Sequence, residues 1–319
     1  MLNPSGGSEW RTVSLYRHLR EHADVKIWRF RQAQASSFTD VEGRAIDIRR
    51  LSFPRGGNLV FIGVYFDIGK WIWLARPRRV ILTYNTPDPV RLAQRIELIR
   101  RACAVEPEIV FCSQELAGQV PFAGTIEPSL VDLAVFLPRP GDAGVSFTVG
   151  RLSRDTPEKH HPNDMALYQK LVQSGCIIDV MGATAAMRTA AEGATNFTLR
   201  PIGDVDAPDF LRSLDCFFYR TSPEWAEPWG RVIIEAMASG VPVVTDRRSG
   251  ASRVIDHGRN GLLFDTDEEA IAAILSLKAD PVLRRSIGKA ARETAEAILS
   301  DEVRERVRNF YLGGIGQMA

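Results

Sequence analysis

The sequence contains little cysteine, almost no net charge and no long apolar run. Its four cysteines form no Cys-x-x-Cys pair and no Cys/His cluster, which argues against a zinc or disulfide framework. Forty basic residues balance 39 acidic ones, and aromatic and basic residues do not interleave, so nucleic-acid binding is not expected. No stretch has the length of a membrane span, and the first residues lack the pattern of a signal peptide. The expected location is cytoplasmic.

The composition is that of an ordinary globular protein with room for two cores. The chain has 319 residues, of which 45% are hydrophobic and 25% charged. A chain of this length normally divides into two domains. Apolar strands alternate with amphipathic helices in two successive series, which indicates an α/β protein with two doubly wound parallel sheets.

The expected elements follow this alternation. Strands are expected in the apolar runs at 25–30, 59–62, 80–84, 109–112, 145–149, 177–181, 197–201, 215–219 and 241–244. Helices are expected in the amphipathic segments at 9–21, 66–75, 90–104, 164–174, 207–214, 230–239, 267–277, 281–299 and 301–311. The Pro- and Gly-bearing stretch 137–143 predicts a hinge. We therefore expect an N-terminal domain over 1–140, a C-terminal domain over 141–300, and a last helix in 301–319 packing back toward the first domain.

Two carboxylates, Glu227 and Glu235, are separated by seven residues. The preceding strand and the following helix place Glu227 in a strand-to-helix loop and Glu235 in the helix. Most neighbours of Glu235 favour burial, and a buried carboxylate needs a partner. An i,i+4 pair with Arg231 would satisfy it, but a basic residue N-terminal to the acid is the poorer orientation. The favoured interpretation is a ligand role, with sugar hydroxyls donating to the carboxylate.

The start of this helix is also suited to an anion. The amides of Trp229, Gly230, Arg231 and Val232 lie at the helix N-terminus, where about half a positive charge accumulates. A phosphate group is the expected occupant. The spacing of the two carboxylates around this helix start therefore indicates a nucleotide-sugar site.

These residues belong to a series of motifs that resembles a known family. The motifs are Gly6-Gly7-Ser8-Glu9, the segment 131–136, Val149-Gly150-Arg151-Leu152 with Lys159, the segment 227–235, and the segment 258–263. In this order they resemble the retaining glycosyltransferases of family 4, also called glycosyl transferases group 1. The resemblance implies the GT-B architecture, in which two Rossmann-like domains enclose a cleft.

The resemblance also implies roles for individual residues. Arg151 and Lys159 would hold the donor diphosphate, with Arg154 as the alternative because the spacing to Lys159 is longer than usual. Glu235 would bind the ribose hydroxyls, and Glu227 would face the transferred sugar together with the amides of 229–232. Gly6 and Gly7 would let the first-domain backbone approach the diphosphate. Asn85 stands where many relatives have a His, and Val205 completes the expected donor-binding set.

The sequence departs from the family pattern in two places. Arg253 occupies a position where relatives commonly carry Glu. Only Met1-Leu2-Asn3 precede Pro4, where the family has a full apolar strand before its glycine loop. We therefore expect the first strand to be short or missing.

The implied activity is transfer of a sugar from a nucleoside-diphosphate sugar to an acceptor hydroxyl, with retention of anomeric configuration and without a metal or other cofactor. Asp204-Val205-Asp206 also matches the Asp-x-Asp motif of metal-dependent transferases, but these acids are interpreted as helix-capping residues. The other alternative is a non-catalytic or regulatory relative that binds nucleotide sugars.

One basic and aromatic stretch bears on the acceptor. Residues 70–79 combine Trp71 and Trp73 with four cations, a composition found where proteins rest on anionic membranes. A core helix with a basic end explains it equally well. The first interpretation predicts a glycan or lipid-linked acceptor, a role in cell-envelope glycan or glycolipid synthesis, and a location at the inner face of the membrane.

Overall fold

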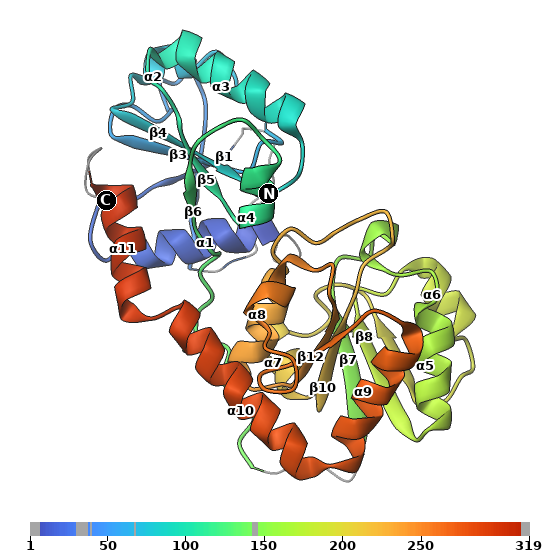
Figure 1. Cartoon of the computed structure of the whole chain (residues 1–319). Coiled ribbons are helices and arrows are strands. Elements are labelled where there is room, and N and C mark those ends of the chain that lie inside the picture. Colours follow the sequence, from blue (N-terminus) through green and yellow to red (C-terminus); the bar gives the residue numbers. More distant parts are fainter. Residues whose placement is uncertain (1–6, 30–37, 39, 67, 142–145, 314–319) are drawn as a thin grey trace. The chain divides into compact units, whose positions relative to one another are not determined.

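The computed structural model describes residues 7–29, 38, 40–66, 68–141 and 146–313. The described chain forms two compact units, here called unit 1 (residues 1–130 and 300–319) and unit 2 (residues 131–299). Figure 1 shows the elements of both. Gly6 and the residues before it lie outside the described residues, so the predicted short first strand and the role of Gly6 stay predictions.

Unit 1 is an α/β unit built on parallel strands. Its four-stranded sheet has the order β3-β4-β5-β6, and a separate parallel pair joins β1 to β2. The strands are β1 (Ile27–Arg29), β2 (Gly43–Ala45), β3 (Asn58–Ile62), β4 (Arg79–Tyr84), β5 (Glu108–Phe111) and β6 (Thr125–Ile126). The helices are α1 (Gly7–Leu19), α2 (Ile72–Ala75), α3 (Pro89–Cys103), α4 (Gln114–Gly118) and α11 (Asp301–Leu312).

Unit 2 contains a six-stranded, fully parallel sheet of order β12-β11-β10-β7-β8-β9. The strands are β7 (Phe147–Leu152), β8 (Cys176–Met181), β9 (Phe197–Arg200), β10 (Cys216–Tyr219), β11 (Val243–Asp246) and β12 (Leu262–Phe264). The helices are α5 (Asp164–Gln173), α6 (Ala185–Ala190), α7 (Ala207–Arg212), α8 (Arg231–Ala238), α9 (Asp267–Ala279) and α10 (Pro281–Ile298), with 3-10 turns η1 (Pro157–Lys159) and η2 (Gly250–Val254).

The central strands of unit 2 are apolar because helices cover both faces of the sheet. All four residues of β10 are at most 2% exposed, as expected for a central parallel strand. Helices α5 and α9 contact each other, and α8 contacts α7 and α10 (Figure 1). Leu167 and Leu171 of α5 are buried in the core formed with β7, β8 and β10. Burial of each such side chain contributes about 1.5–3 kcal/mol.

The boundary between the units falls earlier in the chain than the sequence predicted. We expected it at 140/141, but residues 131–140 belong with unit 2. Phe136 is buried, its carbonyl accepts a hydrogen bond from Arg292 of α10, and Pro138 lies against Gly240. These contacts attach the segment to unit 2, because they are made with α10 and with the end of α8.

The C-terminal helix α11 is part of unit 1. Its Tyr311 is 1% exposed, and the tyrosine hydroxyl lies 3.3 Å from an Oε1 of Glu127, which also pairs with Arg11 at 3.1 Å. Asn58 of β3 donates a hydrogen bond to the Tyr311 carbonyl. The last helix therefore completes the packing of the unit in which the chain begins.

The helix in the basic and aromatic stretch is shorter than the sequence predicted. The helix expected over 66–75 begins only at Ile72, after Gly69, which is a poor helix residue. Trp71 is 3% exposed and its ring lies against Phe61, so it is a core residue. Trp73 and Leu74 are 54% and 52% exposed. In the described residues, no helix is both long and apolar enough to cross a bilayer.

Candidate functional site

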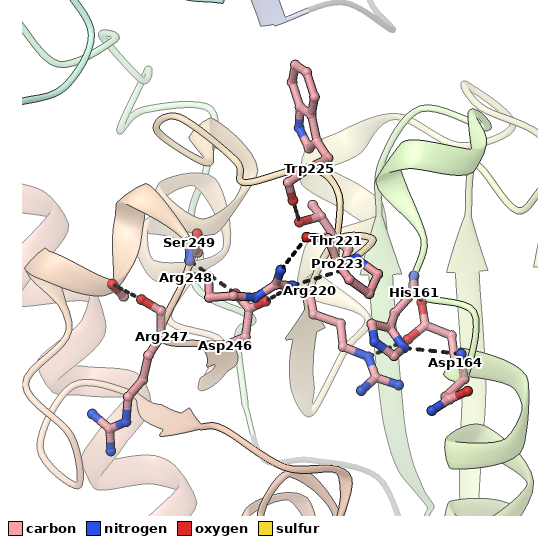
Figure 2. Close-up of polar contacts among 12 residues, drawn as sticks. His161, Asp164, Arg220, Thr221, Pro223, Trp225, Asp246, Arg247, Arg248 and Ser249 are labelled. Atoms are coloured by element: carbon pink, nitrogen blue, oxygen red, sulfur yellow. Dashed lines mark hydrogen bonds and ion pairs between the residues drawn. The ribbon is translucent and has the colours of Figure 1, made fainter. Parts of the chain in front are cut away.

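The candidate site lies in unit 2, in the loops that follow the carboxyl ends of β7, β10 and β11. These three strands are neighbours in the sheet, so their loops share one edge. In open α/β sheets, ligands bind at the carboxyl ends of the strands. Figure 2 shows part of this edge, including the loops after β10 and β11.

Glu227 and Lys159 form an ion pair at this edge. Lys159 Nζ lies 2.5 Å from Glu227 Oε2, and the Tyr219 hydroxyl donates to the same oxygen at 2.8 Å. Burial disfavours the charged carboxylate, but the Lys159 ammonium and the Tyr219 hydroxyl outweigh it and lower the pKa of Glu227. The ammonium also lies 5.3 Å from the centre of the Trp225 ring. Two predicted site residues that are 68 positions apart are thus in direct contact.

Arg151 lies inside β7, and the strand continues one residue beyond it, whereas the resemblance implied a residue after the strand. Its side chain is fully buried, and Nη2 donates to the Lys159 carbonyl. The guanidinium carbon lies 4.6 Å from the centre of the Tyr219 ring. Nε and Nη1 have no hydrogen-bond partner. In this arrangement Arg151 contacts Lys159 and Tyr219, the residue that donates to Glu227, and exposes no surface to a ligand.

Arg154 is the accessible cation of this loop. It is exposed, and its charge contributes to lowering the pKa of Glu227. His160 anchors the same loop, because its Nε2 lies 2.9 Å from the Gly182 carbonyl oxygen. Burial, followed by the nearby Arg151 charge, lowers the pKa of His160 to about 4.

The backbone at the start of α8, after Glu227, has a conformation that requires a glycine. Gly230 precedes α8 with φ of +71°, a conformation that disfavours other residues, and a Cβ there would lie 3.0 Å from the Ile233 side chain. Arg231 and Val232 open the helix and are half-buried, as is Trp229. The Trp229 indole Nε1 is buried without a hydrogen-bond partner. The expected helix over 230–239 is therefore confirmed within a residue at each end.

Glu235 forms the i,i+4 pair that the sequence analysis considered the weaker alternative. Arg231 Nε donates to Glu235 Oε1 at 2.7 Å, and both side chains are less than 10% exposed. Burial raises the pKa of Glu235, and the Arg231 charge offsets this only in part. The poorer orientation did not prevent the pair, because burial leaves each charge in need of a partner. A ribose-binding role for Glu235 stays a prediction.

Arg248, in the loop after β11, forms hydrogen bonds with the loop that leads from β10 to Glu227. Arg248 donates to the Pro223 carbonyl at 3.1 Å, to the Thr221 carbonyl at 3.3 Å and to Asp246 Oδ2 at 3.0 Å (Figure 2). The Thr221 hydroxyl donates to the Trp225 carbonyl within the same turn. Sequence reasoning missed this clamp. The available signal was a carboxylate at a strand end followed by two arginines.

A second arginine joins two more elements. Arg220, directly after β10, donates to Asp164 at 2.7 Å and pairs with Asp267. Asp164 also accepts the His161 amide (Figure 2). The first residues of α5 and α9 are therefore fixed to the end of β10, which the sequence did not indicate.

The turn η2 supports the backbone of Glu227. The Gly250 amide donates to the Glu227 carbonyl at 2.8 Å, and a Cβ on Gly250 would lie 2.1 Å from the Pro228 carbonyl oxygen. Arg253, in the same turn, is exposed. The part of the loop after β11 that lies near Glu227 thus has a structural role.

The Asp-x-Asp segment lies between β9 and α7. Asp204 pairs with Arg200 at 3.1 Å, and Asp206 is the N-cap residue of α7 although its side chain forms no capping hydrogen bond. Val205 between them is half-buried. Across the described ranges, no group of three or more His, Cys, Asp or Glu side chains is arranged to hold a metal ion.

The remaining predicted residues belong to unit 1. Gly7 is exposed at the start of α1, and Asn85 follows β4. Asn85 Nδ2 donates to the Ser8 hydroxyl at 2.9 Å, and its Oδ1 would lie 3.2 Å from a Cβ on Gly63. Asn85 and the start of α1 are therefore neighbours at the carboxyl edge of the unit 1 sheet.

Comparison with known proteins points to one family. Residues 141–294 match the family model of glycosyl transferases group 1. The D-inositol 3-phosphate glycosyltransferase of Pseudarthrobacter chlorophenolicus is 43% identical over 111 residues, which are 34% of this chain and 26% of that protein. The lipopolysaccharide core biosynthesis glycosyltransferase LpsE of Rhizobium meliloti is 37% identical over 109 residues, which are 34% of this chain and 30% of LpsE. The match thus spans less than a third of either relative.

A solved structure extends the likeness to both units. The crystal structure of Anabaena Alr3699/HepE in complex with UDP-glucose matches with a TM-score of 0.71 at 16% identity, covering 97% of this chain and 96% of that one. At this identity the match shows the fold, which is the predicted GT-B type with two Rossmann-like units. The predicted resemblance is confirmed at the level of the family. Residues 141–294 of the chain are therefore similar to the glycosyl transferases group 1.

Proposed function

We propose that this protein transfers a sugar from a nucleoside-diphosphate sugar to an acceptor hydroxyl, with retention of anomeric configuration and without an essential metal. The observation that carries the proposal is the contact of Lys159 with Glu227 beside the start of α8, at the carboxyl edge of the sheet. This contact lies inside the segment that matches the family model. The LpsE and D-inositol 3-phosphate glycosyltransferase relatives, and the UDP-glucose complex of HepE, support the reaction class and a nucleotide-sugar donor.

The cations of the loop after β7 would bind the donor diphosphate. Lys159 and Arg154 can offset the charge that develops on a departing nucleoside diphosphate. The amides at the start of α8 would add partial positive charge. Arg151 would act by holding the Lys159 carbonyl, because its own guanidinium is buried. Gly6, Gly7, Asn85 and Val205 are the remaining proposed donor-binding residues.

The two carboxylates would orient the sugar and the ribose. Glu227 has a lowered pKa and is therefore ionised near neutral pH, so it can accept hydrogen bonds from sugar hydroxyls. Glu235 would accept hydrogen bonds from the ribose hydroxyls. With neither carboxylate assigned as a nucleophile, the proposed route is front-face attack, in which the departing phosphate takes the acceptor proton. Alignment of both substrates in the site would lower the activation free energy by up to about 7–11 kcal/mol.

Donor screening tests the first part of the proposal. Thermal shift is measured with UDP-, GDP- and ADP-sugars, since a ligand at 100 times its Kd stabilises by about 2.7 kcal/mol. We expect one nucleotide class to raise the Tm, and Glu227→Ala and Lys159→Ala to reduce that shift. The absence of a shift with every donor would contradict the assignment of the site.

Turnover distinguishes a transferase from a non-catalytic relative. We expect the protein to hydrolyse the donor that binds or to transfer its sugar. Glu227→Ala should lose this turnover while it keeps its fold. NMR of the product should show the same anomeric configuration, axial or equatorial, as in the donor. Activity that EDTA abolishes and Mn²⁺ restores would contradict the proposal that the reaction needs no metal. Donor binding without turnover, for every acceptor class tested, would favour the regulatory alternative.

An acceptor in cell-envelope glycan or glycolipid synthesis is the proposed partner. Trp73 and Leu74 are exposed, and Lys70 and Arg76 flank them in the sequence, a combination suited to an anionic lipid surface. The protein should co-sediment with vesicles of phosphatidylglycerol. The double variant Trp73→Ala/Leu74→Ala should reduce the fraction of protein that sediments. Equal sedimentation with phosphatidylcholine, or no effect of the substitutions, would contradict the membrane contact.

A further inference from the structure

A hollow in unit 2 opens at the edge of the sheet where β10 and β11 begin. Its volume is about 480 Å³, within the range of small-molecule sites. Asp215 and Pro242 line it and directly precede those two strands. The hollow is bounded on its other sides by α10 and by residues 138–141.

The hollow is separate from the donor site. Glu227 and Lys159 follow the carboxyl ends of β10 and β7, whereas the hollow lies at the amino-terminal ends of β10 and β11. A four-residue strand such as β10 is about 13 Å long at 3.3 Å per residue. None of the residues assigned above to donor binding lines the hollow.

The lining of the hollow is strongly basic and also contains apolar residues. Six basic side chains and three acidic ones line it, although the whole chain carries a net charge of only +1. Leu214, Val241 and Pro242 are among the apolar residues of the lining. The local excess of positive charge attracts anions, and the apolar lining residues favour a ligand with an organic body.

The basic residues differ in their availability. Arg292 is committed to the protein, because it donates to the carbonyls of Phe136 and Ala238 at 2.6 Å each. Arg285 and Lys289 lie one turn apart on α10 and are both exposed. Lys289 has only a 3.8 Å contact with Glu293 at 81% side-chain exposure. Arg285 and Lys289 are therefore better placed than Arg292 to bind a ligand.

A third cation of the lining, Arg139, is fixed by an ion pair. Arg139 Nη2 donates to Asp215 Oδ1 at 2.8 Å, and Asp215 Oδ2 accepts the Thr148 amide at 2.9 Å. The Asp215 side chain is 3% exposed, so it holds Arg139 in place. The arginine keeps its other donors for a bound oxyanion, since guanidinium carries five N–H groups.

We propose that this hollow binds the phosphate monoester of a small organic molecule, with Arg285, Lys289 and Arg139 contacting the phosphate and the apolar lining residues contacting the organic body. Two or more cations match the double charge of a phosphate monoester, and an arginine fork matches its oxygen atoms. The inference goes beyond glycosyl transfer, because it uses none of the donor-site residues.

Isothermal titration calorimetry of the full chain with phenyl phosphate tests this site. We expect saturable binding that weakens at high salt, and a loss of at least tenfold in affinity in the double variant Arg285→Ala/Lys289→Ala. The matched control is Lys170→Ala/Arg259→Ala, which removes two exposed cations of unit 2 outside the hollow. Lys159→Ala reports on binding at the donor site. We expect neither the control nor Lys159→Ala to change the affinity.

Three results would overturn the proposal. Loss of phenyl phosphate binding in Lys159→Ala, with no effect of the α10 variant, would place the phosphate at the donor site. Equal binding of phenol would mean that the apolar lining residues alone are responsible for binding. Failure of phenyl phosphate to bind, combined with co-sedimentation on phosphatidylglycerol vesicles that requires Arg285 and Lys289, would identify a membrane surface instead. Because Lys159→Ala is measured in parallel, failure of the hollow and failure of the donor site are distinguishable.

Discussion

At the scale of single residues, the site depends on charges that the protein buries and then pairs. Glu227, Glu235 and Asp164 are each held by a basic residue from the same unit. A buried charge that loses its partner is costly, whereas an exposed ion pair contributes little. Substitution of one member should therefore have larger effects here than at surface ion pairs.

Glu227→Gln removes the charge that faces the Lys159 ammonium. We expect it to lower the free energy of unfolding by about 1–3 kcal/mol at pH 7, because the buried partner loses its charged hydrogen bond. The pKa of Glu227 is lowered in the folded protein, so this contribution is present above the ordinary Glu pKa of about 4.3 and is lost as pH falls through the lower folded value.

Urea unfolding of parent and Glu227→Gln at pH 7 and at pH 3 measures this difference, which should shrink at the lower pH. Glu224→Gln is the control, since Glu224 is an exposed carboxylate three residues away. Equal losses in the two variants, or a difference that stays constant with pH, would show that the Lys159 pair does not stabilise the fold.

His160 gives a second pH dependence with its own cause. Burial and the Arg151 charge hold its pKa at about 4 in the folded protein, below the ordinary value of 6.5. As pH falls below 6.5 the unfolded chain binds a proton that the folded chain does not bind until about pH 4, so stability decreases over this window. The shift corresponds to up to about 3 kcal/mol.

His160→Gln should flatten the stability profile between pH 6.5 and 4, because the amide does not titrate and can still donate to the Gly182 carbonyl. Chemical unfolding at half-unit pH steps measures the slope. His22→Gln, at an exposed histidine, should leave the slope unchanged. Parallel profiles for the parent and His160→Gln would contradict the assignment to His160.

At the scale of elements, the loop geometry at the carboxyl edge depends on glycines in different surroundings. Gly182 and Gly203 have similar positive φ angles, +89° and +78°. A Cβ on Gly182 would lie 1.8 Å from the Ser153 carbonyl oxygen, whereas a Cβ on Gly203 would meet nothing within 4 Å. Comparison of the two positions separates backbone strain from steric conflict.

Gly203→Ala should cost only the left-handed conformation, about 1–2 kcal/mol. Gly182→Ala should cost about 4 kcal/mol or more, because the loop after β7 must also move away from a rigid carbonyl. Thermal and urea unfolding measure both variants. A similar loss of stability in the two variants would mean that the loop after β7 moves at little energetic cost, and that its position does not depend on Gly182.

The elements and the site differed in how far the sequence could predict them. The period of the apolar residues predicted most helices and strands, and the strand and helix around Glu227 and Glu235 predicted the loop and helix on which they lie. Burial was harder to predict, because it depends on tertiary contacts. For Trp71 the sequence left exposure at a membrane surface and burial in a core helix equally open, and the residue lies in the core. The clamp of Arg248 on the Pro223 carbonyl joins positions 25 residues apart, and no local pattern encodes it.

At the scale of the whole molecule, the chain returns at its end to the unit in which it began. Four contacts of α11 support this: His18 with the Arg304 carbonyl, Asn58 with the Tyr311 carbonyl, Arg79 with the Phe310 carbonyl, and Glu127 with the Tyr311 hydroxyl. The partners come from α1, β3, β4 and the segment after β6. Unit 1 is therefore discontinuous in sequence, whereas unit 2 is continuous.

Truncation after Leu299 should thus destabilise unit 1 while unit 2 keeps its fold. Removal of Tyr311 and Val307 uncovers apolar surface, and the buried Arg11–Glu127 pair loses the tyrosine that covers it. Hydrogen exchange should show lost protection in α1 and in β3 to β5, with protection retained in β7 to β11. The control ends at Gly313, which keeps α11 complete. Equal protection of α1 in both truncated chains would mean that unit 1 is stable without its last helix, and loss of protection in β7 to β11 would mean that unit 2 also depends on that helix.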